Sequence, residues 1–319
     1  MKKTFRALTS LRFFAAIAVV FFHYAGEVRG FGRIPFPLKN LVHRGPLALC
    51  FFFVLSGFVL SISYQDKAIK TAEARRRFWF ARFARLYPAY LLAFVLFLPM
   101  ALQKYLLHPA PELGASGPRT FAAGAILSPL LLQSWTTFSQ AWNGPGWSLS
   151  VEAFFYFLFP YVAFRLMRQQ TSVALTIPIA LWVASLCVVL AHLQGHLSNP
   201  IYHDRIQYNP LFWTPCFVAG IVTAGFAPRW QKVSAKMAGV LTISSVAALV
   251  LICLFVSPRY EDVIVTTGLL PLLALVILCC SHESARVVAL LGSSPLYELG
   301  EVSYITYILQ SPLWHAFSA

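Results

Sequence analysis

The chain has very few charged residues, and this scarcity excludes an ordinary soluble globular protein. Only 11% of its 319 residues are Asp, Glu, Lys or Arg, whereas soluble domains carry about 25%. Hydrophobic residues make up 58% of the chain, and the mean hydropathy is +0.68. Apolar segments recur along the whole chain, so the first of them is not a simple cleavable signal. The composition therefore predicts a polytopic membrane protein.

The chain also lacks the signatures of several soluble enzyme classes: a Walker A loop, a G-x-S-x-G elbow and an H-E-x-x-H motif. Its six cysteines lack the spacing of metal ligands and all fall in apolar segments, which is typical of small core residues. The net charge of +14 is explained by a positive-inside bias and by anionic headgroups more readily than by nucleic acid.

Ten apolar runs are each close to the roughly 20 residues that a membrane-spanning helix needs. They are 8–26, 46–64, 87–107, 121–138, 147–166, 173–192, 210–227, 238–256, 263–281 and 301–318. The run 121–138 contains Pro129, Gln133 and Ser134, which predicts a re-entrant or short outer segment buried by protein. We expect an all-α, polytopic transmembrane helical bundle of about nine spans plus one re-entrant segment, with 1–319 as a single domain.

Basic residues are distributed unequally between the two expected sides of the membrane. With the N-terminus in the cytoplasm, sixteen of the 25 Lys and Arg residues lie in segments expected inside and eight in segments expected outside. This is the positive-inside pattern. A full span at 121–138 would place Arg165 and Arg168 outside, so the pattern also favours a non-spanning segment there. We therefore expect a multi-pass protein with a cytoplasmic N-terminus.

The first apolar run contains Arg12 and His23, two residues that are costly in a membrane. They are eleven residues apart, which on an α-helix is three turns plus ~20°, so they share one face and lie about 16 Å apart along the axis. This face would carry a fixed cation near one membrane surface and a buried, titratable imidazole. We interpret the pair as part of a functional site.

The stretch 73–88, in which arginines alternate with aromatic residues, is typical of an interfacial helix. Arg82 and Arg85 share a face at the N-terminal side of the span 87–107, where the helix dipole disfavours cations. Paired guanidinium groups suit phosphate or pyrophosphate. The alternative is an anchor for anionic lipid headgroups, which is the preferred interpretation for the three arginines at 75–77.

Glu152 is a third candidate, because it lies near the start of an apolar run. Its carboxylate would either complement a helix N-terminus or be buried and pair with Arg12 or His23. We favour the functional interpretation.

Six short motifs of the chain, in their order along the sequence, resemble those of the acyltransferase-3 family of bacterial inner-membrane proteins. The resemblance runs from the first apolar run to the end of the chain. It rests on six motifs: Arg12 and His23 with ten residues between them, Phe51-Phe52-Phe53-Val54-Leu55-Ser56-Gly57-Phe58, Arg82-x-x-Arg85, Trp147-Ser148-Leu149-Ser150-Val151-Glu152, Phe217-Val218-Ala219-Gly220-Ile221 and Leu299-Gly300-Glu301-Val302-Ser303-Tyr304-Ile305-Thr306-Tyr307-Ile308-Leu309. Two features depart from the family pattern. Gln310 stands where a His is common, and the chain ends at Ala319, where one more span is expected.

The resemblance implies an O-acyltransferase of the bacterial inner membrane that moves an acyl group, often acetyl, from cytoplasmic acyl-CoA to a hydroxyl. Acceptors in the family include cell-surface or exported glycans such as exopolysaccharides, lipid-linked sugars, peptidoglycan and macrolides. The expected partners are acyl-CoA, such an acceptor and the lipid bilayer, with no bound cofactor, metal or nucleic acid. The implied catalytic residues are His23, Arg12 and Glu152, and the implied substrate-binding residues are Arg82, Arg85, Trp147, Ser148 and Tyr304.

Attack of a hydroxyl on a thioester needs a general base with a pKa near 7, for which His is the usual residue. We hypothesise that His23 takes the proton, that Glu152 orients or charge-balances His23 or Arg12, and that Arg12, Arg82 and Arg85 hold the donor phosphates. An acyl-His intermediate is an alternative. The rival function is a proton-coupled transporter or flippase of lipid-linked glycans, which buried ionisable residues would also suit. The sequence has no inverted repeat and no paired broken helices, which favours the enzyme.

Overall fold

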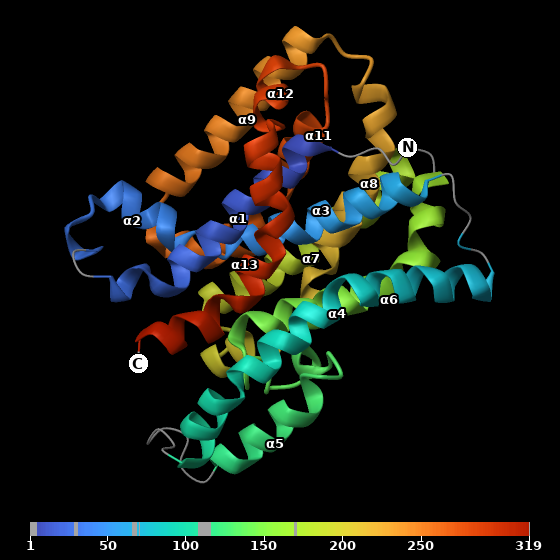
Figure 1. Cartoon of the computed structure of the whole chain (residues 1–319). Helices are drawn as coiled ribbons and strands as arrows, with labels where there is room; N and C mark the ends of the chain where they lie inside the picture. Colours follow the sequence, from blue (N-terminus) through green and yellow to red (C-terminus); the bar gives the residue numbers. More distant parts are fainter. Residues whose placement is uncertain are drawn as a thin grey trace. The chain divides into compact units, whose positions relative to one another are not determined.

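The computed structural model describes residues 5–28, 31–65, 69, 71–107, 116–168 and 171–318. The regular structure in these ranges is helical, and they contain no strand (Figure 1). The α-helices are α1 (Arg6–Tyr24), α2 (Phe36–His43), α3 (Leu47–Tyr64), α4 (Ala72–Leu102), α5 (Gly117–Leu127), α6 (Trp147–Arg168), α7 (Thr171–Leu193), α8 (Pro210–Trp230), α9 (Ala235–Phe255), α10 (Glu261–Val263), α11 (Leu270–Cys280), α12 (Arg286–Leu291) and α13 (Ser294–Ser318). The predicted all-α fold class is confirmed.

Seven helical segments within the described ranges are long and apolar enough to cross a membrane. They are Arg6–Glu27, Leu47–Tyr64, Ala72–Leu107, Gly144–Met167, Leu175–Leu193, Pro210–Trp230 and Ala235–Phe255. The bent pair Glu261–Gly268 and Leu270–Cys280 would make an eighth. Helix α13 has 25 residues but is not among these segments, so the ninth span stays a prediction. Helix α5 has 11 residues and is about 16 Å long, too short for a ~30 Å hydrocarbon core, as predicted.

The hydropathy pattern predicts one continuous span over 263–281, but the structure breaks it. Thr266 has non-helical backbone angles (φ −99°, ψ −112°), and the two halves meet at 51°. The indole of Trp182 donates a hydrogen bond to the Thr267 carbonyl oxygen (2.8 Å), and Ser185 Oγ lies 2.9 Å from Thr267 Oγ1. Side chains of α7 therefore satisfy polar groups that the break releases, as an apolar surrounding requires.

The chain divides into two compact units. Unit 1 comprises Met1–Ala68, Tyr161–Leu190 and Trp213–Tyr304, and unit 2 comprises Ile69–Pro160, Ala191–Phe212 and Ile305–Ala319. Arg12 and His23 belong to unit 1, whereas Arg82, Arg85 and Glu152 belong to unit 2. This division describes local compactness, and the single domain over 1–319 stays a prediction.

In unit 1, α3 and α8 cross so closely that only glycine fits at the contact. A Cβ atom on Gly57 would lie 2.2 Å from the Phe217 carbonyl oxygen, and one on Gly220 would lie 2.0 Å from the Val54 carbonyl oxygen. Close approach through small residues is a common way for helices to associate in a membrane. Helix packing therefore accounts for the glycines in two of the six motifs, Phe51 to Phe58 and Phe217 to Ile221.

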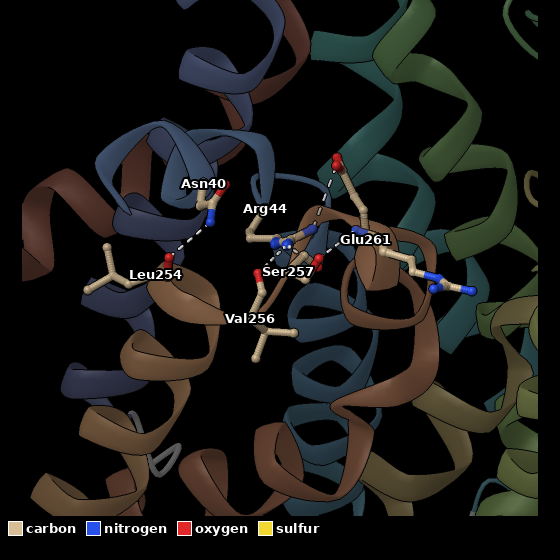
Figure 2. Close-up of polar contacts among 7 residues, drawn as sticks. Asn40, Arg44, Leu254, Val256, Ser257 and Glu261 are labelled. Atoms are coloured by element: carbon tan, nitrogen blue, oxygen red, sulfur yellow. Dashed lines mark hydrogen bonds and ion pairs between the residues drawn. The ribbon is translucent and has the colours of Figure 1, made fainter. Parts of the chain in front are cut away.

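A buried arginine closes one end of α9 in unit 1 (Figure 2). Arg44 is 3% exposed and donates hydrogen bonds to the carbonyl oxygens of Val256 (3.1 Å) and Ser257 (3.4 Å). Its Nη1 lies 3.6 Å from Glu261 Oε2. A cation suits this place because the carboxyl end of a helix carries partial negative charge. Arg44, which is one of the eight basic residues in segments expected outside, is therefore a buried helix cap.

In unit 2, α4 runs antiparallel to α6. The ring of Phe78 stacks on that of Phe159 (5.4 Å between centroids) near one end of the pair. Near the other end, a Cβ atom on Gly146 would lie 3.1 Å from the Tyr90 ring. The opposite directions are those expected for two spans that cross the membrane in opposite senses.

Polar contacts hold the non-spanning segment against α4 and the start of α6. The Tyr90 hydroxyl donates to the Ser128 carbonyl oxygen (2.8 Å), and Gln133 Nε2 donates to the Gly146 carbonyl oxygen (2.9 Å). Gln133 is only 2% exposed. Burial by protein is thus confirmed for Ser128 and Gln133 but not for the whole segment, because Ile126, Leu130 and Leu132 are exposed.

Candidate active site

Arg82 and Arg85 lie inside a long helix rather than at its beginning. Helix α4 starts at Ala72, ten residues before Arg82, and the Thr71 side chain caps it by accepting a hydrogen bond from the Ala74 backbone N–H (3.1 Å). Because the helix dipole acts mainly within the first turn, the inference that it disfavours cations at Arg82 and Arg85 is wrong. The predicted phosphate-binding role must rest on their surroundings instead.

The surroundings distinguish the two arginines. Arg82 is half-buried, and its Nε is buried without a hydrogen-bond partner within the described residues. Arg85 is exposed. A buried guanidinium N–H without an acceptor is costly, and an anion would supply one. Arg82 is therefore the stronger candidate for an anion ligand.

Tyr156 hydrogen-bonds to Glu152 and lies within electrostatic range of both arginines. The Tyr156 hydroxyl donates a 2.5 Å hydrogen bond to Glu152 Oε1 one turn back on α6. The charges of Glu152, Arg82 and Arg85 all act on this hydroxyl. The structure thus brings together three predicted site residues from two separate motifs.

Sequence reasoning missed Tyr156 as a site residue. The available signal was its position four residues after Glu152, which places both side chains on one face of a helix.

A groove of about 220 Å³ lies between α4 and α6 beside this cluster. Its lining includes Arg82, Tyr156, Tyr90 and Leu131. The rest of its wall is apolar or aromatic, from residues Trp79, Phe83, Leu86, Tyr87, Leu149, Ala153 and Phe157. A cation in the wall of a mainly apolar groove suits a ligand with a charged head and a less polar arm.

Leu131, which lines this groove, has a positive φ of 56°, unlike any other non-glycine residue within the described ranges. This left-handed conformation is costly for a leucine. The Ser150 hydroxyl donates a 2.6 Å hydrogen bond to the Leu131 carbonyl oxygen and so fixes the conformation. Ser150 of the Trp147 to Glu152 motif thereby shapes the wall of the groove.

Ser148 and Tyr307 form a buried hydroxyl pair in unit 2. Ser148 Oγ lies 2.7 Å from Tyr307 Oη, and the two oxygens lie 2.9 and 3.0 Å from the Pro145 carbonyl oxygen. The contacts of Ser148 join α6 to α13, and its substrate-binding role stays a prediction. The charge of Glu152 also acts on the Tyr307 hydroxyl. Tyr307 is thus a second residue close to the site that sequence reasoning missed.

Trp147, Tyr304 and Gln310 are three further residues that the family motifs single out. Trp147 is 5% exposed, and its ring lies 4.9 Å from that of Tyr208. Tyr304 is half-buried on α13. Gln310, where a His is common in the family, is buried, and its Nε2 donates to the Tyr307 carbonyl oxygen (2.9 Å). Substrate binding by Trp147 and Tyr304 stays a prediction.

Arg12 and His23 lie on one continuous helix, α1, as predicted. Arg12 is half-buried. His23 lies in the last turn and is exposed, between the rings of Phe22 (5.2 Å) and Tyr24 (5.8 Å). The protein does not bury the imidazole, contrary to the expectation, and its position within the membrane stays a prediction. Pairing of Glu152 with Arg12 or His23 stays a prediction.

No group of three or more His, Cys, Asp or Glu residues in the described ranges is arranged to hold a metal ion. Of the cysteines, five are buried as expected of small core residues, but Cys187 is exposed on α7.

The chain is similar to known acyltransferases. It is 35% identical to the acyltransferase MdmB of Streptomyces mycarofaciens over 168 residues, 51% of this chain and 40% of MdmB. It is 25% identical to the O-acetyltransferase OatA of Staphylococcus aureus over 331 residues (97% and 49%). It is 23% identical to the peptidoglycan O-acetyltransferase OatA of Listeria monocytogenes over 346 residues (99% and 50%).

The chain spans half or less of the length of these curated relatives. No solved structure matches it significantly. The family model of the acyltransferase domain matches residues 5–319, nearly the whole chain. With its helical membrane fold, the chain therefore belongs to the acyltransferase-3 family.

Proposed function

We propose that this chain is an integral-membrane O-acyltransferase that moves an acyl group, acetyl in the simplest case, from cytoplasmic acyl-CoA to a hydroxyl of a cell-surface or exported glycan or a lipid-linked sugar. The observation that carries the proposal is the convergence of Arg82, Arg85 and Glu152 around Tyr156 beside the α4–α6 groove. The family match supports the same reaction class.

The donor phosphates bind Arg82 and Arg85. The buried Nε of Arg82, which has no hydrogen-bond partner among the residues that the structure describes, supports this assignment, because an N–H without an acceptor favours an anion. The exposed guanidinium of Arg85, one turn further along α4, adds charge at the same place. Tyr156 holds the Glu152 carboxylate in place through its hydrogen bond.

His23 is the general base for the acceptor hydroxyl. As its imidazole takes the hydroxyl proton, the acceptor oxygen attacks the thioester carbonyl carbon, and the CoA sulfur leaves as a thiolate. Arg12, on the same helix about 16 Å from His23, helps Arg82 and Arg85 to hold the donor phosphates. An acyl-His intermediate is the alternative route, and it predicts a covalently labelled protein after rapid quenching.

The glycan acceptor is proposed because two relatives are named as O-acetyltransferases, one of them for peptidoglycan. The protein would lie in the bacterial inner membrane with its N-terminus in the cytoplasm. The opposite directions of α4 and α6 agree with this order of crossings. Reporter fusions in the segment after Tyr64 should read cytoplasmic, and a periplasmic reading would reverse the orientation.

One observation favours the rival function of a transporter. The broken pair Glu261–Gly268 and Leu270–Cys280 is a discontinuous helix of the kind that transporters use at their substrate sites. Transporters usually carry such breaks in pairs related by internal repeats, and the described ranges contain one. Trp182 and Ser185 already satisfy polar groups at the break, so it needs no transported ligand.

The deciding experiment is incubation of the purified protein in lipid nanodiscs with acetyl-CoA labelled in the acetyl group. The proposal predicts release of free CoA and transfer of label to an added glycan acceptor. A transporter would do neither. Intact acetyl-CoA in the presence of a panel of hydroxyl acceptors, with protein shown to be folded, would overturn the proposal.

A further inference from the structure

Cys50 and Cys216 touch each other inside unit 1. Their Sγ atoms are 3.0 Å apart, and both residues are 0% exposed. They lie 166 residues apart in the chain, on α3 and α8. No other pair of cysteines in the described ranges makes a sulfur–sulfur contact.

The helix crossing explains the contact. Cys50 lies seven residues before Gly57 on α3, and Cys216 lies four residues before Gly220 on α8. These spacings place each cysteine on the same helix face as its glycine. A Cβ atom at either glycine would meet the backbone of the other helix, so the two backbones nearly touch at the glycines, and the sulfur contact shows that the helices are still close at the cysteines. A disulfide needs such an approach, with Cα atoms about 4.4–6.8 Å apart.

Both cysteines lie near the same end of the helix pair. Cys50 is the fourth residue of α3 and Cys216 the seventh of α8. The contacts of Cys50 with Cys216 and of Phe53 with Trp213 come before the glycine crossing on both helices, so the helices run parallel. In the proposed orientation, this end faces the outside of the membrane, where thiols are oxidised.

We propose that Cys50 and Cys216 form a disulfide that joins α3 to α8. The thiolate of one cysteine attacks a disulfide of an oxidising envelope protein, and the second thiolate then displaces that protein's sulfur. The two cysteines lose two protons and two electrons, and the oxidant's disulfide becomes two thiols. Exchange takes place during insertion, before the crossing closes over the sulfurs. The alternative is that both cysteines remain reduced and serve only as small packing residues.

The test uses the full chain in cells that are quenched with acid and then denatured in N-ethylmaleimide, which blocks every free thiol before air can oxidise it. Digestion and mass spectrometry without reductant should find the Cys50 peptide linked to the Cys216 peptide, and reduction should abolish the link. In most molecules, four of the six cysteines should carry maleimide. Maleimide on both Cys50 and Cys216 would overturn the proposal.

Matched variants complete the test. Cys50→Ser should leave Cys216 open to maleimide, whereas Cys187→Ser, at the exposed cysteine, should leave the link intact. Linkage that forms only after a copper oxidant is added to purified protein would show that the sulfurs are adjacent, but it would refute formation in the cell. None of these readouts depends on acyl transfer, so failure here leaves the proposed enzyme standing.

Discussion

Replacing Arg82 with Gln should weaken acyl-CoA binding more than replacing Arg85 with Gln. Arg82 lines the α4–α6 groove and has a buried Nε with no hydrogen-bond partner within the described residues, whereas Arg85 is exposed. Gln retains hydrogen bonding and part of the packing but removes the charge. The comparison therefore isolates what burial adds to a charge–phosphate contact.

The size of the difference follows from the local dielectric. Two unit charges 4 Å apart interact by about 1 kcal/mol in bulk water and by about 4 kcal/mol at an effective dielectric constant of 20. Desolvation of the phosphate offsets part of the larger value. We expect Arg82→Gln to cost about 1.4–2.8 kcal/mol, or ten- to a hundredfold in Kd. Arg85→Gln should cost about 1 kcal/mol or less, as exposed ion pairs do.

The assay is equilibrium binding of acyl-CoA to purified protein in nanodiscs. Arg76→Gln is the matched control, because Arg76 is exposed on the same helix and does not line the groove. All three variants should insert normally, since other basic residues still mark this segment as cytoplasmic. An unchanged Kd for inserted Arg82→Gln protein, or a larger loss in Arg85→Gln, would refute the argument from burial.

Three further predictions concern other parts of the chain. His23→Gln keeps hydrogen bonding but cannot act as a base, so acyl transfer should fall by about 10²–10⁴ with donor binding unchanged; near-normal turnover would make His23 a structural residue. Gly57→Ala should reduce the yield of monodisperse protein on size-exclusion chromatography, because the new Cβ meets the backbone of α8 at 2.2 Å. Gly239→Ala, where no atom lies within 4 Å, should leave the yield unchanged. Equal yields of the two variants would disprove the close crossing. Arg44→Gln should lower the free energy of unfolding by about 1–3 kcal/mol, because the Val256 carbonyl oxygen and the Glu261 carboxylate lose their partner. The loss is limited because the carboxylate is partly solvated. An unchanged melting temperature would show that Arg44 does not cap the helix.

The candidate site could be predicted in part. The sequence identified Arg82, Arg85 and Glu152 because charged residues next to apolar runs are costly and stand out locally. It did not identify Tyr156, because the only signal was its spacing of four residues from Glu152, and many aromatic residues of this helix have similar spacings to a neighbour. The position of Arg82 within α4 was also misjudged, because Thr71 starts the helix well before the apolar run that marks the span.

Composition and hydropathy by themselves determined the all-α membrane class and most of the spans, because the cost of placing a polar group in lipid is a property of each segment alone. Tertiary structure decided which segments meet. The break at Thr266 depends on Trp182 and Ser185 of another helix. Arg82 and Arg85 lie near Glu152 because α4 and α6 pack side by side in opposite directions. Contacts between residues far apart in the chain leave no periodic mark in either segment, and so only the folded structure could reveal them.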